Sequence, residues 1–367
     1  MKVPYINLAA QHIPIMSELL AEVESVLKTG QFILGKTVAD FEKKFAEICG
    51  ANYAIGVANG TDALVLALKV AGIKAGDEVI TAPNSFLASA SSIALAGAIP
   101  VFADVRDDFN IDPEQIKKLI GPKTKAIMPV HLTGRPADMD AIMDIANAHN
   151  LIVIEDAAQA VGASYGNKKV GSIGHLACFS LHPLKNLSAA GDGGVITTNN
   201  KLYYDKLMIM RNHGLKNRDE CVYWSLNSRL DAMQAALLNV KLKYLANWTE
   251  RRRTLAAIYQ DRIKDLVKVP MDSNKEKAVY HTFIIQTEFR DELQESLLAK
   301  DIESKVHYPI PIHFQEAAKQ LAYQKGDFPV TEAQVGKILS LPVYPELSDE
   351  QVHYVCDTII EFFKNKI

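Results

Sequence analysis

Hydrophobic and polar positions along residues 50–200 follow two rhythms, and together they predict strands and helices in turn. Short apolar runs alternate with longer segments in which apolar residues recur every three or four positions. The runs predict strands at residues 54–57, 78–82, 100–103, 126–130, 151–155, 177–180 and 194–197. Helices are expected between most of them, as at 61–70, 85–96 and 138–148. This order predicts a largely parallel sheet covered by helices, with functional loops at the carboxyl ends of its strands.

The pattern changes on both sides of this alternating part. Before it, apolar residues from Ile15 to Leu27 recur at helical spacing and predict an amphipathic helix. Beyond about Leu230 the pattern becomes a long helical region, at 231–262. Strand-like segments follow at 282–285 and 305–308, and the last helix is expected at 349–364. We therefore expect a large domain over residues 1–240 and a smaller C-terminal domain over 241–367.

Composition and charge exclude several classes of function. The chain has 367 residues, 48% of them hydrophobic, and its formal net charge of −3 leaves no overall positive field for nucleic acid. The basic run 251–253 is interpreted as a solvated helix face. The first residues lack the apolar core of a signal peptide and no apolar stretch is long enough to span a bilayer, so we expect a cytoplasmic protein without a membrane partner.

Cysteine and histidine spacing does not indicate a metal. Cys49, Cys178, Cys221 and Cys356 are far apart and form no CxxC pair, so we interpret them as buried small hydrophobes. The histidines share no ligand spacing. We expect neither a metal site nor a disulfide framework.

An acidic pair follows the apolar run at 151–154. Strand alternation would direct Glu155 and Asp156 to opposite sides of the sheet, so that one carboxylate can enter a site at the strand's carboxyl end. A carboxylate that faces a pyridine nitrogen keeps this nitrogen protonated and makes the ring an electron sink. The alternative interpretation is that Asp156 is a helix N-cap.

Two segments at the same edge could bind a flat, phosphorylated ligand. Gly60 and Thr61 lie between a strand and an apolar helix, where free N–H groups and the helix dipole can bind phosphate. A plain capped helix is the alternative. Phe86 follows the next strand, and its ring can stack on a flat cofactor or be a core residue.

Lys185 lies among apolar and small residues, shortly before the glycine-rich turn 191–194. An amine in such a setting can be desolvated and can attack a carbonyl, so Lys185 could carry a Schiff base. A structural lysine on the surface is the other interpretation. His182 lies nearby and could transfer protons or have a structural use.

These motifs occur together in the order and spacing of one family. The matching segments are Gly60–Leu64, Glu155–Gln159, Phe179–Lys185 and Asn227–Arg229. On them the chain resembles the sugar-nucleotide aminotransferases of the DegT/StrS group, which are fold-type I enzymes dependent on pyridoxal 5′-phosphate. The resemblance covers residue 32 to the last helix. It implies an α/β fold with a mostly parallel mixed sheet between helices and a smaller C-terminal α/β domain.

The resemblance also implies roles around the cofactor ring. Lys185 would form the Schiff base, and Asp156 would partner the pyridine nitrogen. Gln159 would hydrogen-bond the ring hydroxyl, and Phe86 would stack on the ring.

The phosphate of the cofactor would be held from two subunits, according to the same resemblance. Gly60, Thr61 and Ser180 would bind it from one chain, and Asn227 would reach it from another. The resemblance therefore implies a homodimer with shared active sites, in which cofactor binding and assembly are linked.

The substrate implied is a nucleotide-linked keto sugar, with glutamate as the amino donor. The run 307–313 resembles the HYPxPxH segment of family members that aminate C3 of dTDP-linked 3-keto-6-deoxyhexoses. Candidate substrate contacts are His182, Arg229, His307 and Tyr308. Amination at C4 of a dTDP- or UDP-linked 4-keto-6-deoxyhexose is the alternative within the family.

Three other functions remain alternatives. A related branch of the family catalyses dehydration but carries His at the position of Lys185, and the lysine argues against it. The fold could instead serve as a non-catalytic, pyridoxal phosphate-binding regulatory protein. A nucleotide-sugar oxidoreductase would need a glycine fingerprint, GxGxxG, which this chain lacks.

Overall fold

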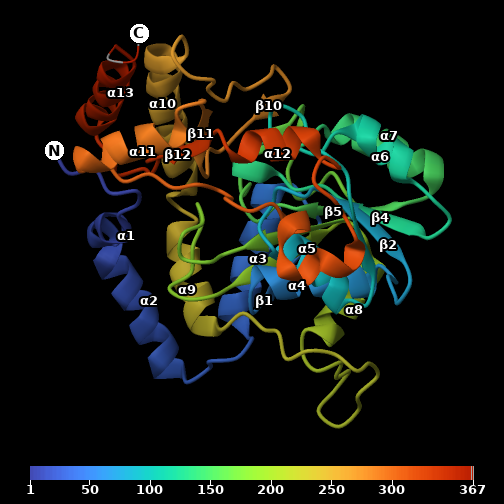
Figure 1. Ribbon diagram of the computed structural model, residues 1–367. Coiled ribbons are helices and arrows are strands. Elements are labelled where there is room, and N and C mark those ends of the chain that lie inside the picture. The colour runs from blue at the N-terminus through green and yellow to red at the C-terminus, as the bar shows by residue number, and fades with distance from the viewer. Residues whose placement is uncertain (365, 367) are drawn as a thin grey trace.

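A seven-stranded sheet forms the centre of the computed structural model, which describes residues 1–364 and 366 (Figure 1). Its strand order is β1-β9-β8-β5-β4-β2-β3. The strands are β1 (Tyr53–Val57), β2 (Glu78–Thr81), β3 (Ile99–Phe102), β4 (Thr124–Met128), β5 (Ile152–Asp156), β8 (Leu176–Ser180) and β9 (Gly194–Thr198). All seven predicted strands are thus confirmed. β9 runs antiparallel to both of its neighbours, and the other strand pairs are parallel.

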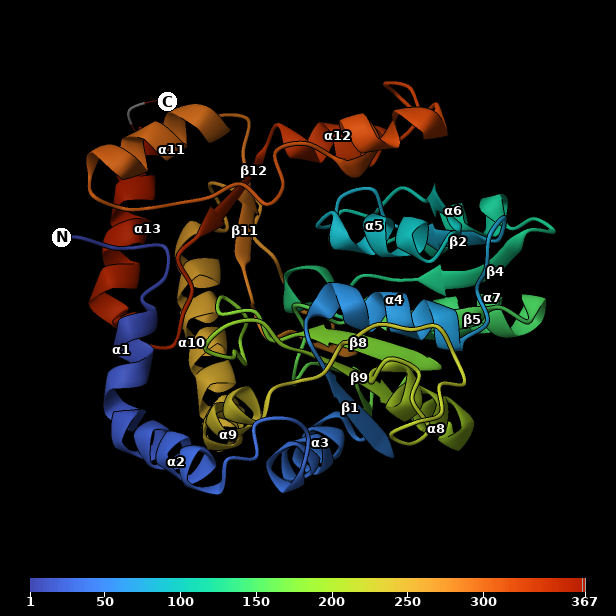
Figure 2. The same ribbon diagram turned by 90° about the horizontal axis from the view of Figure 1, so that it is seen from below.

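Helices cover both faces of this sheet (Figure 2). One face is buried by α4 (Gly60–Val70), α5 (Ala88–Leu95) and α8 (Lys201–Met210). The other is buried by α3 (Lys36–Cys49), α6 (Pro113–Leu119), α7 (Met139–His149) and α9 (Ala232–Lys241). Ile154 belongs to the first core and Val153 to the second, so successive residues of β5 face opposite layers. The predicted fold class is confirmed.

The C-terminal part builds a core of its own around a small sheet. β11 (Phe283–Gln286) pairs antiparallel with β12 (Ile338–Leu341). Around them lie α10 (Leu245–Ile263), α11 (Arg290–Ala299) and α13 (Asp349–Lys364), whereas α12 (Pro329–Val335) extends over α5 and its first N–H groups donate to Asp104. Val3 joins this core, since its N–H donates to the Asp301 carbonyl at 2.9 Å and its carbonyl accepts from the Glu303 N–H at 2.9 Å. The first residues of the chain therefore complete its last core.

The remaining elements are short or peripheral. α1 (Leu8–His12) leads into α2 (Met16–Thr29), which lies along α9. The strands β6 (Ser164–Tyr165), β7 (Lys168–Lys169) and β10 (Glu276–Lys277) form a small separate sheet. Single turns of 3-10 helix lie at Ile13–Ile15, Leu132–Gly134 and Ile312–Phe314, with a longer one at Glu316–Leu321. Within the described residues, no helix is both long and apolar enough to cross a bilayer.

Two predictions of secondary structure need correction. The helical region predicted at 231–262 is divided between α9 and α10 by a turn at 242–244. The strand predicted at 305–308 is wrong, because only Lys305 forms an isolated bridge, to Ser340. Pro309 and Pro311 follow directly, and a proline has no N–H with which to continue a ladder.

Two predictions about side chains are also wrong. The basic run 251–253 is no solvated face, because Arg252 is buried and its Nη1 donates to the carbonyls of Tyr280 and Val343. Its neighbours form ion pairs, Arg251 with Asp349 and Arg253 with Asp272. The helix thus uses its arginines to join segments of the C-terminal core.

Of the four cysteines, three are buried as expected. Cys221 is exposed, since it lies in the loop that follows α8 rather than in a core element.

Candidate functional site

A cavity of roughly 510 Å³ lies at the carboxyl ends of β5 and β8, beside the start of α4. Parallel strands bring their carboxyl ends to one edge, which explains why residues far apart in the sequence meet here. The predicted site residues that line the cavity are Gly60, Thr61, Phe86, Asp156, Gln159, Ser180, His182, Lys185, His307 and Tyr308. Asn227 and Arg229 are not among the residues that line it.

Asp156 is the last residue of β5, and its carboxylate is buried on the cavity side. The Ser89 hydroxyl donates to its Oδ2 at 2.7 Å, and the Ala158 N–H donates to its Oδ1 at 3.2 Å. Burial raises the pKa of Asp156, and these two hydrogen bonds oppose the rise. A turn follows β5 rather than a helix, so the interpretation of Asp156 as a helix N-cap is wrong.

Glu155 points to the opposite side of the sheet, as strand alternation predicted. Its carboxylate accepts from three backbone N–H groups of the loop 171–174, at 2.7 to 3.2 Å. It also lies 3.0 Å from Nε2 of His131, whose Nδ1 accepts from the Ala137 N–H. Since Nδ1 is an acceptor, Nε2 carries the hydrogen and donates it to Glu155. Glu155 is therefore fully engaged in the core and leaves Asp156 as the carboxylate of the cavity.

Lys185 lies in the loop 181–193 between β8 and β9 and reaches the cavity. Burial lowers the pKa of its amine to about 8, although the Asp156 carboxylate opposes this shift. The interpretation as a surface lysine is thereby wrong. An amine with such a pKa is in part neutral near pH 8, as a nucleophile or base must be.

The loop that carries Lys185 is fixed at several points. The Lys185 N–H donates to the His182 carbonyl at 2.9 Å. From α9, Gln234 accepts from the Ala190 N–H at 2.8 Å, and the Lys241 amine donates to the Ser188 carbonyl at 2.8 Å. These contacts fix the backbone of the loop, whereas the Lys185 side chain extends from it into the cavity without a hydrogen bond to any described residue.

The start of α4 has the form of a phosphate cradle. Asn59 caps the helix by accepting from the Asp62 N–H at 2.8 Å, and its carbonyl accepts from the Ala63 N–H at 3.1 Å. Within the described residues the N–H groups of Gly60 and Thr61 have no acceptor. A Cβ on Gly60 would lie only 2.8 Å from Cβ of Ser180, so glycine alone permits this approach. The residues present therefore fit a phosphate group.

Aromatic residues and Gln159 form another wall. Phe86 is 56% exposed in the single chain, so the core interpretation of this residue is wrong, and its ring lies 5.8 Å from that of Tyr308. Oε1 of Gln159 accepts from the Thr133 N–H at 2.6 Å, and its Nε2 donates to the Tyr308 hydroxyl at 3.3 Å. Burial raises the pKa of Tyr308 to about 12 and lowers that of His307 to about 4, so both side chains are neutral near pH 7.

Asn227 and Arg229 lie outside the cavity, where the chain returns from the loop that follows α8. Asn227 forms an antiparallel bridge with Asn212, and Arg229 donates to the Asn212 side chain at 2.7 Å. The loop between Asn212 and Asn227 projects from the rest of the chain in Figure 1, and its Trp224 is 95% exposed. The role of Asn227 across an interface stays a prediction.

The polar residues that line the cavity and were not predicted as site residues are Asn59, Ser89, Asp192 and His281. Two of them, Ser89 and His281, show why sequence reasoning missed them. His281 comes just before the predicted strand 282–285, but a single histidine at a strand start carries no spacing signal. Ser89 lies in a serine-rich segment that was predicted only as a helix. Their proximity to Asp156 and Lys185 results from tertiary packing.

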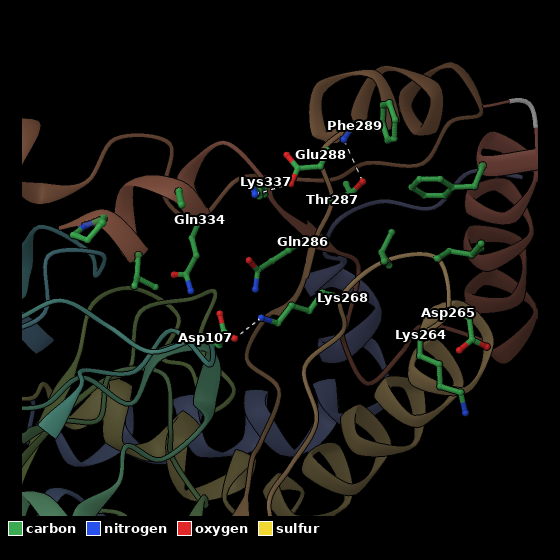
Figure 3. A pocket seen from close by; sticks show the side chains of 16 residues that line it. Asp107, Lys264, Asp265, Lys268, Gln286, Thr287, Glu288, Phe289, Gln334 and Lys337 are labelled. Atoms are coloured by element: carbon green, nitrogen blue, oxygen red, sulfur yellow. Dashed lines mark hydrogen bonds and ion pairs between the residues drawn. The ribbon is translucent and has the colours of Figure 1, made fainter. Parts of the chain in front are cut away.

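A larger hollow of roughly 770 Å³ lies elsewhere, between the end of α10, β11 and α12 (Figure 3). None of the predicted site residues lines it. Its charged groups neutralise one another, as in the pairs Lys268–Asp107 at 2.9 Å and Lys337–Glu288 at 2.6 Å. Size alone therefore does not identify the site. The smaller cavity is the candidate site, because it contains the side chains that can react and bind a cofactor. The described residues hold no cluster suited to a metal ion.

Comparison with known proteins agrees with this geometry. Residues 14–360 match the model of the DegT/DnrJ/EryC1/StrS aminotransferase family. A "pleiotropic regulatory protein" of Geobacillus stearothermophilus is 44% identical over 100% of both chains. A dTDP-3-amino-3,6-dideoxy-alpha-D-galactopyranose transaminase of Aneurinibacillus thermoaerophilus is 42% identical over 97% of this chain and 98% of its own. The crystal structure of DesV of S. venezuelae with a ketimine intermediate has a TM-score of 0.96 and 39% identity, covering 98% of each chain.

Proposed function

This chain belongs to the DegT/DnrJ/EryC1/StrS aminotransferase family, and we propose that it transfers an amino group from glutamate to C3 of a dTDP-linked 3-keto-6-deoxyhexose. Transamination of a nucleotide sugar is its activity, and pyridoxal 5′-phosphate is its cofactor. The observation that carries the proposal is the Lys185 amine, which reaches a cavity beside the buried Asp156 with a pKa of about 8.

The residues of the cavity divide the work of binding. Gly60, Thr61 and Ser180 would hold the phosphate of the cofactor, which offers acceptor oxygens to N–H groups and hydroxyls. Phe86 would lie against the ring face. Gln159 would reach the ring hydroxyl with the same amide that now faces Tyr308.

Asp156 and Lys185 would carry out the acid–base chemistry. When bound, pyridoxal phosphate supplies an electron sink for the carbon that bears the amino group. Asp156 would hold the proton on the ring nitrogen, and Ser89 would keep its carboxylate oriented. The Lys185 amine would take a proton from Cα of the amino donor and deliver it to C4′ of the cofactor, and would carry a proton in the opposite direction when the keto sugar receives the amino group. Because the amine is partly neutral near pH 8, it can do both without a large energetic penalty.

The choice of C3 is supported by two observations. The segment 307–313 keeps the HYPxPxH pattern, and its first two residues, His307 and Tyr308, line the cavity. A transaminase 42% identical to this chain is named for a dTDP-3-amino sugar. His182 also lines the cavity and would contact the substrate, whereas Arg229 could do so only from a second chain.

The homodimer is supported by apolar side chains that are exposed in the single chain. Those of the N-terminal segment are Ile13, Met16, Leu20, Leu27, Phe32 and Ile33. Large apolar side chains exposed in this number along one segment of a chain are typical of a surface that another chain covers. We propose that a second copy covers it and that Asn227 completes the phosphate site of that copy.

The proposed division into residues 1–240 and 241–367 is supported by the separate core that surrounds β11 and β12. Val3 is an exception, because it packs in that second core. We propose a cytoplasmic location, because the four cysteines are free, as is usual in a reducing compartment.

A substrate panel tests the proposal. The purified protein is incubated with glutamate and pyridoxal phosphate, together with 3-keto or 4-keto sugars linked to dTDP or UDP. We expect an amino product from dTDP-linked 3-keto-6-deoxyhexoses. Turnover of 4-keto substrates alone would contradict the C3 assignment and favour amination at C4.

A non-catalytic regulatory role is the second candidate, because one 44% identical relative is named a pleiotropic regulatory protein. The two candidates differ in the first half-reaction. A protein that binds pyridoxal phosphate but forms no pyridoxamine phosphate with any amino donor would support the regulatory role.

A further inference from the structure

Ser228 is a fully buried polar residue that has no place in the roles assigned above. It directly follows Asn227, where the chain returns from the loop after α8. It is not among the residues that line the cavity. A buried hydroxyl forms its hydrogen bonds with its immediate neighbours, so these neighbours indicate what Ser228 does.

The Ser228 hydroxyl holds the peptide that leads into the phosphate cradle. Its Oγ accepts from the Ala58 N–H at 3.1 Å. Ala58 is the single residue between the end of β1 and Asn59, which is the N-cap of α4. Within the described residues no backbone carbonyl accepts from this N–H. The hydroxyl therefore fixes the turn from which the N–H groups of Gly60 and Thr61 follow.

The backbone that carries Ser228 is fixed in its turn. The Ser228 N–H donates to the Arg211 carbonyl at 2.9 Å. The buried Arg211 guanidinium donates to the Gly56 carbonyl at 3.0 Å and forms an ion pair with Glu42. Oε1 of Glu42 also accepts from the Gly56 N–H at 2.7 Å. Ser228 is thus attached to the end of β1 and the turn after it by two routes.

Close packing leaves this turn little freedom. A Cβ on Gly194 would lie 2.3 Å from the Asn59 carbonyl oxygen, and a Cβ on Gly56 would lie 2.9 Å from Cβ of Leu230. β9 and the segment after Ser228 therefore approach the backbone on both sides of Ala58 without room for a methyl group. The position of the cradle is set by these neighbours, and Ser228 supplies the hydrogen bond among them.

Asn227 has different neighbours, although it is adjacent in the chain. It forms an antiparallel bridge with Asn212 at the base of the projecting loop. The backbone is extended at such a bridge, and successive side chains of an extended chain point to opposite sides. The proposed function assigns Asn227 to the phosphate site of a second copy, whereas Ser228 reaches the cradle of its own chain through Ala58.

We propose that Ser228 is a positioning residue for the cofactor phosphate of its own chain, so that the adjacent residues 227 and 228 serve the sites of two different subunits. The inference rests on the proposed function, which gives the phosphate to Gly60 and Thr61. With the hydroxyl in place, the cradle is ordered before the phosphate arrives, and binding costs less entropy. Without it the Ala58 N–H lacks its acceptor, and the turn is free to move.

The first experiment compares two ligands that differ only in the phosphate. The dissociation constants of pyridoxamine phosphate and of pyridoxamine are measured by equilibrium dialysis on the full-length protein. Their ratio reports the contribution of the phosphate site. We expect S228A to lower this ratio about fivefold, by weakening the binding of pyridoxamine phosphate alone.

Two further variants separate the hydrogen bond from a loosened fold. S228T keeps the hydroxyl and should restore the preference for the phosphate. S225A removes another hydroxyl of the same loop, which donates to the Met210 carbonyl at 2.6 Å, and should bind both ligands as the wild type does. The same preference in wild type and S228A would overturn the proposal. An equal loss of affinity for both ligands would overturn it too, because a loosened fold does not single out the phosphate.

Mixed dimers show which subunit each residue serves. One chain carries K185A, so that only the other chain can give the visible absorbance of the covalently bound cofactor, and this absorbance is titrated with pyridoxal phosphate. S228A should weaken binding when it is on the chain with Lys185, and not when it is on the K185A chain. N227A should show the reverse. Both variants acting from the same chain would overturn the assignment to two subunits.

Failure of the proposed function has a different signature. A wild type that does not prefer pyridoxamine phosphate to pyridoxamine has no phosphate site, and the proposed function and the inference would then fall together. A wild type with this preference, combined with an unchanged preference in S228A, would contradict the inference alone.

Discussion

Lys185, which is half-buried, and Lys241, which is buried, have the same lowered pKa, about 8, and differ in what surrounds them. Lys185 reaches the cavity and has the Asp156 carboxylate nearby. Lys241 is 1% exposed, and its amine donates to the carbonyl and the hydroxyl of Ser188 at 2.8 and 3.2 Å. Burial is the main cause of the shift in both.

The difference teaches that a lowered pKa does not by itself make a lysine reactive. The Lys241 amine is shielded from water, but it donates its hydrogen bonds to Ser188 and so fixes the backbone of the loop. Lys185 is held only through its backbone, and its amine faces open space. The two residues nevertheless cooperate, because Ser188 lies three positions after Lys185 in the loop that Lys241 fixes.

The largest effect is expected for Lys185→Ala. This change removes the amine that binds the cofactor and moves the proton, so turnover should fall below detection and the visible absorbance of the covalently bound cofactor should disappear. Absorbance spectra and product formation check both. An active variant that retains the absorbance would contradict the role of Lys185 and remove the difference between the two lysines.

Asp156→Asn should also be severe, with a loss of at least about a hundredfold in kcat, because an amide does not keep the ring nitrogen protonated. It also sharpens the comparison. Asp156 raises the pKa of Lys185, so the loss of its charge should shift the pH profile for chemical acetylation of the Lys185 amine to lower pH. The profile of Lys241 should not move. A shift at both lysines would mean that the fold, rather than one charge, has changed.

Lys241→Met should spare the absorbance of the bound cofactor and act on stability instead. The pKa of Lys241 is about 8 in the folded chain and 10.5 in the unfolded one, so the unfolded chain binds more protons between these values. Wild-type stability therefore gains from this group as the pH rises from about 8 to 10.5, and the variant lacks that gain. The difference in free energy of unfolding should grow by roughly 3 kcal/mol at most across this window.

Urea unfolding of wild type and Lys241→Met at several pH values measures this difference. Lys201→Met, which removes an exposed lysine, is the matched control and should show no such slope. If Lys241→Met abolished the cofactor absorbance, Lys241 would belong to the site and the comparison would fail.

The smallest effect is expected for Ser89→Ala. The hydroxyl supports the charged form of Asp156 through a hydrogen bond of 2.7 Å, so its loss should raise the pKa of the carboxyl further. We expect pyridoxal phosphate to bind about tenfold more weakly, and equilibrium dialysis measures this. Ser91→Ala, on an exposed part of the same helix, should bind as the wild type does.

Hydrophobic patterning predicted the central sheet because its strands are nearly continuous apolar runs. It could not show that β9 runs antiparallel, since a buried strand reads the same in both directions. The run 305–308 misled because its aromatic residues face the cavity rather than a core. Arg252 was wrongly predicted to face solvent, because the carbonyls that accept its hydrogen bonds in the core come from segments distant in the sequence.

The sequence predicted those site residues that lie at or directly after the end of a strand. Asp156 and Gly60 could be found because each comes at a fixed offset from an apolar run. His281 and Lys241 could not, because their neighbours in space lie 95 and 53 positions away along the chain. Which nitrogen of the His281 ring carries the hydrogen, for example, depends on Asn186, which is distant in the sequence.

The pairing of Val3 with the segment around Ile302 has a consequence for biosynthesis. During translation Val3 leaves the ribosome long before its partner exists, so this edge of the second core waits for nearly the whole chain. The large sheet can form in the meantime, since all its strands precede residue 199. Deleting the segment around Val3 would therefore disturb the last step of maturation rather than the first.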